Sequence, residues 1–443
     1  MSPTREVYWN ITGIWLMYVL LIPTLFTFAY GLYHHYRSWR IGTPEGRSDH
    51  IVQRIKGMLV YALGQTRIIS NRFARIFHTF LFSGFVILFV GTLVVLVHED
   101  LNFRIMQGNF YLYFQSLTLD VFGLLSILGV VVAIYHRYVL KPERLHSSWG
   151  DAVLLALLLA ILLTGFAVEG LRIGATGDPW ARWSPIGMTV GELARAFLPA
   201  DVLRPLHVFL WWFHLMVVFA LIAWLPYSKL LHIVTSVANI FFRSLEPKGA
   251  MLKPLDMETS NSFGVKEINQ FSWKDLLDLD ACTECGRCQD ACPAFATGKP
   301  LSPKSLILDL REYLKAHGPE LLGRQREESG SEPRLTGKAI KEETLWSCTT
   351  CMACMQECPV FIEQVPKIVD MRRYLVMEEG NFPETMQQAL RSLETRGHPY
   401  SGVSASRLDW CKGLNVRILS DVGAADCLYW VGCSTALNAR NQK

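Results

Sequence analysis

Eight of the eleven cysteines in this 443-residue chain fall into two runs with one spacing, Cys-x2-Cys-x2-Cys-x3-Cys-Pro. The runs comprise Cys282, Cys285, Cys288 and Cys292, and Cys348, Cys351, Cys354 and Cys358. Soft thiolates select zinc or iron–sulfur clusters, and gaps of two residues let three thiolates bind three corners of one cubane. The fourth cysteine of such a run ligates the other cluster in two-cluster ferredoxins. The spacing therefore favours two [4Fe–4S] clusters over zinc, with Cys358 completing the first and Cys292 the second.

Five histidines on two apolar segments form a second group of candidate iron ligands: His78, His98, His207, His214 and His232. At about 100° per residue, the last three fall within roughly 20° of one another on a helix. His214 and His232 lie about 27 Å apart along the axis. Ionisable groups inside a bilayer are costly and usually functional, and imidazoles on facing helices suit haem iron. The pattern favours haem near each membrane face over ordinary interfacial hydrogen bonds.

Five apolar stretches position these histidines: 10–33, 74–98, 118–139, 150–171 and 205–227. Each has about 20 residues with few charges, the length that crosses a bilayer. The first lacks a preceding basic stretch and a small-residue cleavage site, and Arg37 and Arg40 follow it, so it is not a cleaved signal peptide. Loops on one side hold eleven Lys or Arg residues against six on the other. The positive-inside rule then places the N-terminus outside and the C-terminal half in the cytoplasm.

Composition divides the chain into a membrane half and a soluble half. Hydrophobic residues make up 51% of the sequence, yet 52 of the 82 charged residues lie in the last 203 positions. This excludes a single globular enzyme and a disordered chain. The sequence contains no basic run with interleaved aromatics, the pattern that would indicate a nucleic-acid partner. The cysteine runs indicate metal ligation in a reducing compartment rather than disulfides.

The expected fold is an all-α membrane bundle of five helices over 1–240, a linker over 241–270 and a mainly α-helical ferredoxin-type domain over 271–400. Ser302-Pro303 followed by spaced leucines predicts a helix between the two runs, and residues 366–379 predict another. The Gly-, Glu- and Lys-rich segment 318–342 predicts an exposed loop. Histidines beside the inner loops, including His35 and His136, are expected to be interfacial or solvated.

Two segments carry a resemblance to a known cytochrome. The stretch from Phe213-His214-Leu215 to His232-Ile233 is similar to the last span of the nitrate reductase gamma subunit, a five-helix dihaem cytochrome b, and Arg75-Ile76-Phe77-His78 resembles its second span. The resemblance implies that His78 and His232 hold the cytoplasmic-side haem and that His214 is one ligand of the outer haem.

The remaining outer ligand departs from that family, which places a histidine ten residues after the first, where this chain has Leu88. His98 is close in depth to His214 but about 200° around the helix from His78. A bend at Gly84 or Gly91, or helix crossing, would be needed to direct both histidines of this helix towards the fifth span. His207 is the competing partner for His98.

The soluble half resembles the helical ferredoxins found in succinate dehydrogenase and in heterodisulfide reductase. Residues 427–433 suggest a buried strand, and with 434–443 they resemble the opening of a cysteine-rich CCG domain, of which 401–443 would be an incomplete part. Cys433 alone cannot build such a site, so we expect a fragment or a second polypeptide that supplies the rest. Cys411 and Cys427 are expected to be buried apolar thiols.

The fused arrangement resembles membrane iron–sulfur oxidoreductases that link electron-transferring flavoprotein to menaquinone. It implies a respiratory electron-transfer protein of a bacterial or archaeal cytoplasmic membrane, with two [4Fe–4S] clusters, one or two b haems, menaquinone as substrate and a cytoplasmic flavoprotein as partner. One alternative is a component similar to heterodisulfide reductase that reduces a disulfide or sulfur compound. The other is a noncatalytic membrane-anchored ferredoxin whose histidines bind nothing.

No residue forms a nucleophile or an acid–base pair, so no catalytic side chain is expected and the chemistry belongs to the cofactors. Asp120, Glu169 and Glu99 lie near the outer ends of the spans. Hydrated interfacial carboxylates are the favoured interpretation, and handling of quinol protons is the alternative.

Overall fold

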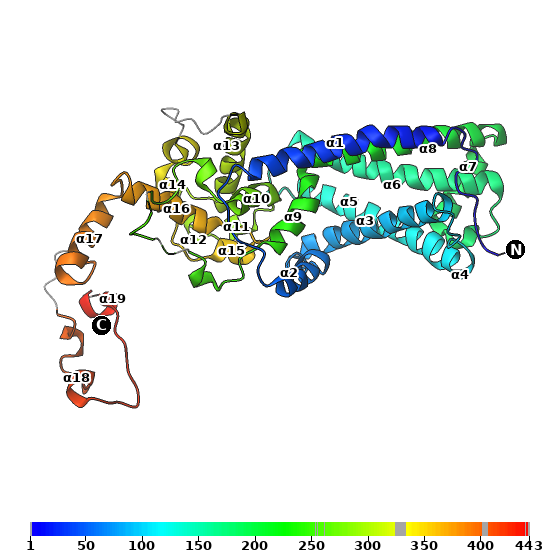
Figure 1. The fold of residues 1–443 in the computed structure, drawn as a ribbon. Coiled ribbons are helices and arrows are strands. Elements are labelled where there is room, and N and C mark those ends of the chain that lie inside the picture. Colours follow the sequence, from blue (N-terminus) through cyan, green and yellow to red (C-terminus); the bar gives the residue numbers. More distant parts are fainter. Residues whose placement is uncertain are drawn as a thin grey trace. The chain divides into compact units, whose positions relative to one another are not determined.

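The computed structural model describes residues 2–441, except 253, 255, 261, 324–333, 401–405 and 439. Five of its helical stretches are long and apolar enough to cross a membrane, which confirms the predicted number of spans (Figure 1). They are α1 (Trp15–Trp39), α3 (Arg72–Glu99), Gly108–Val139 with α5 (Leu119–Ile134) at its centre, α6 (Trp149–Thr176) and α8 (Ala200–Trp224), which continues to Tyr227.

The spans form a bundle in which α3 packs on α5, α5 on α6, α6 on α8 and α8 on α1. Gly84 and Gly91 of α3 face α5, and a Cβ at Gly84 would overlap Ser126 Oγ. Small residues of this kind let two membrane helices approach closely. α3 is one continuous helix, so the two glycines admit α5 rather than break the helix.

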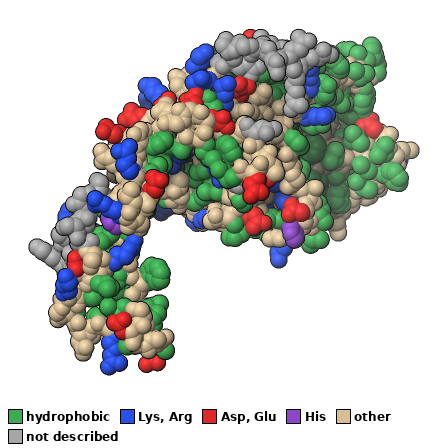
Figure 2. Space-filling model, turned by 60° about the vertical axis from the view of Figure 1, so that its left-hand side comes forward, with side chains coloured by type: hydrophobic (Ala, Val, Ile, Leu, Met, Phe, Trp, Pro, Cys, Tyr) green, Lys and Arg blue, Asp and Glu red, His purple; other side chains and the backbone are tan. Residues whose placement is uncertain are grey.

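We call the end of the bundle that meets the cysteine runs the inner end and the opposite end, near the N-terminus, the outer end (Figure 1). At the inner end, α2 (Ile51–Met58) and α9 (His232–Phe241) pack on each other, and α9 also packs on α10 (Trp273–Ala281). At the outer end, α7 (Pro185–Phe197) packs on α6 through Gly170 and Gly191. Hydrophobic side chains cover much of the bundle's surface, whereas charged ones gather over the soluble part (Figure 2).

The cysteine runs are framed by short helices around a buried apolar core. The helices are α10, α11 (Arg287–Asp290), α12 (Pro293–Ala296), α13 (Pro303–Gly323), α14 (Glu342–Trp346), α15 (Ala353–Glu357) and α16 (Gln364–Met377). Leu276, Leu310 and Met371 are fully buried. The two predicted helices are confirmed as α13 and α16.

The predicted exposed loop over 318–342 is wrong at both of its ends. α13 continues to Gly323, and Leu335 and Ile340 are buried. These two apolar side chains anchor the returning chain in the core, which the polar composition of the segment did not indicate. Residues 324–333 of the predicted loop lie outside the described residues.

The chain forms two compact units, Met1–Leu255 with Val265–Met371, and Asp256–Gly264 with Arg372–Lys443. The membrane bundle and both cysteine runs therefore belong to one unit. The second unit contains α17 (Glu384–Arg396), α18 (Leu419–Val422) and α19 (Cys433–Leu437).

The strand predicted over 427–433 is wrong, because no strand occurs in the described part of the chain and Trp430 is 86% exposed. A strand requires a paired neighbour for its backbone groups, and no described segment provides one. Cys427 is exposed and Cys411 is half-buried, so neither is the buried thiol that we expected.

Candidate functional site

The two cysteine runs adopt matching backbone conformations. Glu284 and Gly286 have positive φ angles of 57° and 75°, and Thr350 and Met352 have 53° and 62°. Each pair lies two and four residues after the first cysteine of its run. Backbone in such turns directs successive N–H groups to one side, as in many iron–sulfur sites. The sequence repeat is therefore also a repeat of local structure.

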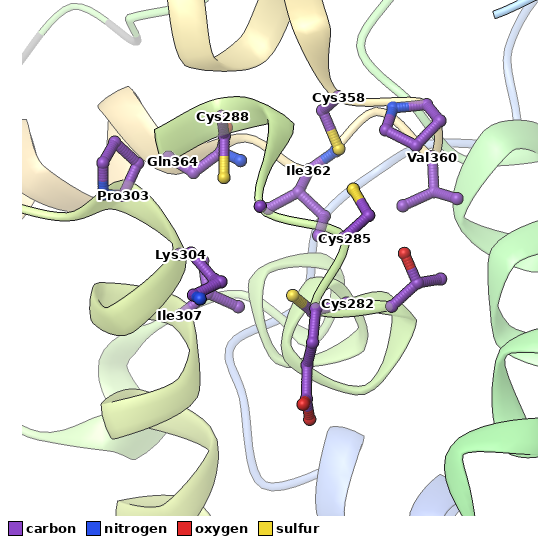
Figure 3. Close-up of a pocket in the computed structure, with 14 residues that line it drawn as sticks. Cys282, Cys285, Cys288, Pro303, Lys304, Ile307, Cys358, Val360, Ile362 and Gln364 are labelled. Atoms are coloured by element: carbon purple, nitrogen blue, oxygen red, sulfur yellow. The ribbon is translucent and has the colours of Figure 1, made fainter. Parts of the chain in front are cut away.

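Cysteines from both runs line one cavity. We call them the first cysteine set: Cys282, Cys285, Cys288 and Cys358. Their sulfur atoms point towards a common space (Figure 3). Within the described residues, no three His, Cys, Asp or Glu side chains converge closely enough for a single metal ion. Thiolates spread around a cavity fit the corners of a cubane better than the closed tetrahedron of a zinc site.

The other four cysteines of the runs are the second cysteine set: Cys348, Cys351, Cys354 and Cys292. Burial raises the pKa of Cys354 to about 12, and the neighbouring thiols of Cys348, Cys292 and Cys351 add to this effect. The structure thus brings together the two sets that the spacing predicts. Buried thiols with raised pKa values must release protons when they bind a metal cluster.

Burial affects the first set in the same way. It raises the pKa of Cys358 to about 12, with Cys285 as the nearest thiol influence, and that of Cys282 to about 11. The amide of Ile362 donates a hydrogen bond of 3.3 Å to Cys358 Sγ. Such N–H···S bonds tune the reduction potentials of bound clusters.

The first set lies against the inner end of the bundle, and the loop 64–71 between α2 and α3 makes the contact. Arg67 donates to the carbonyl of Cys358 at 2.7 Å. Arg287, from between two cysteines of the first run, donates to the carbonyls of Arg67 and Ile68 at 2.7 and 3.0 Å. A Cβ at Gly286 would lie only 2.8 Å from Arg144 Cβ, so glycine permits this close approach.

The second set reaches solvent through one residue. Cys351 is exposed, as are Thr349 and Thr350 beside it, whereas Cys292 and Cys354 are buried. The first set thus lies at the joint with the bundle, and the second set has one cysteine at the surface.

A buried ion cluster stabilises the joint. Asp278 accepts hydrogen bonds from Lys274 at 2.7 Å and Lys367 at 2.6 Å, and all three side chains are at most 1% exposed. Asn239 of α9 donates to the same carboxylate at 2.8 Å. Burial by itself would raise the pKa of Asp278, but the two ammonium groups hold it well below its usual range.

Two histidines expected to be interfacial or solvated instead make specific contacts within the protein. His35 lies 2.8 Å from Asp280 and 3.1 Å from the carbonyl of Pro226, so acceptors face both of its nitrogens. His136 is buried, with its ring centroid 4.8 Å from that of Phe73. Both predictions were wrong because the partners come from distant segments or facing helices.

His78 and His232 are the two inner-end histidines, and both have their Nδ1 atoms engaged by acceptors. His78 Nδ1 lies 3.0 Å from Gln65 Oε1, and His232 Nδ1 lies 2.6 Å from the carbonyl of Lys229. Because these oxygens only accept, each Nδ1 carries the proton and each Nε2 keeps its lone pair. This is the tautomer of a metal-binding histidine whose other nitrogen is held by the protein. The two imidazoles also interact electrostatically, so they are neighbours.

His214 shows the same arrangement deeper in the bundle. Thr164 of α6 donates its hydroxyl proton to the carbonyl of Ala160 at 2.6 Å, and its oxygen lies 2.8 Å from His214 Nδ1. His214 therefore donates from Nδ1 and keeps a free Nε2. Its chemistry suits a ligand of an outer haem.

His98 and His207 differ from these three. The amide of Met106 donates to His98 Nδ1 at 3.2 Å, which places the proton on Nε2. His207 is 3% exposed, packs edge-on against Trp9, and its Nδ1 has no described partner. His207 and His214 lie seven residues apart on α8, so a porphyrin between them would cut through their own helix. On this geometry His207 is not the ligand that opposes His214.

Two of the carboxylates considered for proton handling are engaged in helix contacts. Asp120 accepts hydrogen bonds from the amides of Ile186 and Gly187 at 2.9 and 3.0 Å, so it caps α7. Glu169 accepts from Ser184 at 3.0 Å. These contacts favour a structural role over quinol chemistry.

Comparison with known proteins agrees with both halves of the site. Residues 64–246 match the nitrate reductase gamma subunit family, and residues 274–359 match the 4Fe-4S dicluster domain family. Both resemblances inferred from the sequence are thereby confirmed.

Three relatives illustrate the similarity. The EtfAB:quinone oxidoreductase of Syntrophomonas wolfei is 36% identical over 474 residues, covering 100% of this chain and 66% of that protein. The probable iron-sulfur-binding oxidoreductase FadF of Bacillus subtilis is 30% identical, covering 91% of this chain and 62% of that protein. A component of the dihydromethanophenazine:CoB–CoM heterodisulfide reductase of Methanosarcina barkeri is 35% identical, covering 37% of this chain and 39% of that protein. The chain thus spans just under two thirds of the first two relatives. No solved structure matches it.

Proposed function

Because the chain joins a nitrate reductase gamma-type domain to a 4Fe-4S dicluster domain, we propose that it is a membrane oxidoreductase that passes electrons between a cytoplasmic redox protein and the menaquinone pool. One observation supports this most directly. The first cysteine set lies at the inner end of the bundle, and the loop 64–71 forms hydrogen bonds to both Cys358 and His78.

We assign one [4Fe–4S] cluster to each cysteine set, and these clusters and b haem supply the one-electron chemistry when bound. The chain itself fixes their positions, surrounds the first set with apolar side chains such as Ile307 and Val360, and exposes Cys351 of the second set to solvent. The surface at Cys351 is where a soluble donor would meet the protein.

For haem, we assign His78 and His232 to the inner site and His214 to the outer site. His98 remains the candidate for the other outer ligand, and His207 is the competing partner for His98 in place of His214. The hydrogen bond from the Met106 amide to His98 Nδ1 leaves the proton on Nε2, and this tautomer disfavours His98 as a haem ligand. Nδ1 of His207 has no described partner, so that imidazole is available.

We place the N-terminus outside and the cysteine runs in the cytoplasm, from the distribution of Lys and Arg. The name of the Syntrophomonas relative couples EtfAB to quinone. By that likeness, the proposed donor is a reduced electron-transferring flavoprotein and the acceptor is menaquinone in a cytoplasmic membrane.

A second candidate function runs in the opposite direction, from quinol to a disulfide or sulfur compound. It is favoured by the similarity to the Methanosarcina heterodisulfide reductase.

The test is an anaerobic visible spectrum of the purified protein before and after addition of a menaquinol analogue. Growth of a reduced b-haem band is the expected result, with the His232→Ala variant as control. A haem band that responds to dithionite but not to menaquinol would contradict the quinone link. A colourless membrane half would instead support a membrane-anchored ferredoxin.

Addition of reduced flavoprotein or of a disulfide substrate then separates the two directions. Reduction of the clusters by flavoprotein supports the first. Oxidation of prereduced clusters by a disulfide supports the second.

A further inference from the structure

We propose that Gln65 is a positioning residue for the inner haem ligand His78, and that it raises the electron-donating strength of this imidazole. The inference rests on the proposed assignment of haem to His78. Gln65 lies outside the spans, in the loop 64–71, and neither the cysteine nor the histidine pattern indicates it.

The side chain of Gln65 is committed to His78. It is 6% exposed, and its Oε1 lies 3.0 Å from His78 Nδ1. An amide oxygen accepts only, so the imidazole donates from Nδ1 and directs Nε2 away from the loop. A hydrogen bond of this kind fixes the ring orientation and increases the basicity of the ligating nitrogen.

The backbone of Gln65 is a second, independent sign that its side chain is needed. Its φ is +50°, in the left-handed region that glycine adopts freely and that a side chain disfavours. Its carbonyl accepts hydrogen bonds from the amides of Ile68 and Ile69 at 2.8 and 3.2 Å, so the conformation is held by a tight turn. Glycine would suit this turn better, yet the position holds a glutamine whose side chain reaches the imidazole.

The same loop also contacts the first cysteine set. Two residues after Gln65, Arg67 donates to the carbonyl of Cys358, and its own carbonyl accepts from Arg287. A single short loop thus bonds at one point to an inner histidine and at another to a cysteine of the first set. Gln65 thereby fixes the imidazole relative to that set as well as within the bundle.

The experiment is a redox titration of the b haem in the full chain, monitored by visible spectra and by low-spin haem EPR. The component missing from His232→Ala identifies the inner haem. Gln65→Leu and Gln65→Gly both remove the acceptor, and the glycine variant does so without strain in the turn. Because a weaker imidazole donor stabilises ferric iron less, both variants are expected to shift the inner midpoint potential to more positive values.

The direction of the shift separates positioning from mere structural support. A site loosened and opened to water would favour the charged ferric form and move the potential to more negative values. Gln65→Glu retains an acceptor oxygen at the same reach, so its potential should lie at or below that of the wild type. Gln115→Leu is the matched control, since Gln115 is also buried but donates to the backbone carbonyl of Gly91; it should leave the inner potential unchanged.

An unchanged or more negative inner potential in both Gln65→Leu and Gln65→Gly would overturn the inference, as would a positive shift in Gln65→Glu. Failure of the proposed function is distinguishable, because the wild type would then lack a haem signal before any variant is compared.

Discussion

Replacement of Asp278 by asparagine tests the buried ion cluster at the joint between the bundle and the cysteine runs. The carboxylate is fully buried and accepts from Lys274, Lys367 and Asn239, and the amide of Glu363 adds a fourth hydrogen bond at 3.0 Å. The neutral amide of asparagine leaves two buried ammonium groups with one counter-charge fewer. Breaking a buried pair in this way costs about 3–5 kcal/mol. At about 2–4 °C per kcal/mol, the range for domains of about 150–250 residues, the melting temperature should fall by about 6–20 °C.

The assay is thermal loss of iron–sulfur absorbance in detergent at one fixed heating rate, because this signal reports on the soluble helices rather than on the spans. Asp290→Asn is the matched control. Asp290 pairs with Arg144 at 3.3 Å across the same joint, but its side chain is 52% exposed. Exposed pairs contribute about 0–1 kcal/mol, so this variant should melt close to the wild type.

The pH dependence of the effect has a definite sign. The pKa of Asp278 is lowered in the folded state, so its stabilisation is complete above the unfolded value of about 3.9 and is lost only as pH falls through the lower folded value. The difference between wild type and Asp278→Asn should therefore be constant between about pH 6 and 8. If the stability of Asp278→Asn lies within about 1 kcal/mol of that of the control, the expected cost of removing a buried counter-charge is refuted.

Three further predictions address the cofactor and capping assignments. His232→Ala should lose the inner haem absorbance and keep the iron–sulfur signal, so full haem content would contradict the ligand assignment. Cys292→Ala should perturb the EPR signal of the cluster assigned to the second cysteine set, and Cys358→Ala that of the cluster at the joint; the reverse pattern would exclude exchange of ligands between the runs. Asp120→Ala should destabilise the membrane half by about 0.5–2 kcal/mol, the usual cost of a lost helix cap, while menaquinol still reduces the haem. A variant that is stable but unreactive towards menaquinol would make Asp120 a proton-handling residue.

The cysteine sets were predictable from the sequence because gaps of two residues leave the thiolates few arrangements. The five spans were predictable because each needs only length and apolar composition. His78, His214 and His232 were proposed as ligands from helical spacing together with resemblance to a known cytochrome, and they remain predictions. Local patterns sufficed in each case because the determining residues are close in sequence.

Contacts between distant segments were not predictable in this way. Gln65 precedes His78 by 13 residues and reaches it only through the turn of the loop. Arg67 and Cys358 are 291 positions apart. The amide of Met106 determines which nitrogen of His98 carries the proton, and the periodicity of the sequence does not reveal this contact. The strand over 427–433 failed for a related reason, because hydrophobic character alone does not supply a pairing partner.

The joint also determines how the protein can move during turnover. Asn239 and Arg67 on the membrane side bond to Asp278 and to the carbonyl of Cys358, and Arg287 bonds back in the other direction. A soluble head on a swinging tether would have to break these contacts in every cycle. The cysteine runs are instead fixed to the bundle, so turnover should not depend on the length of a hinge or on rotation of a domain. In the proposed electron transfer, the lipid-soluble quinone and the soluble partner would be the diffusing components, and the protein would hold its cofactors at fixed positions between them.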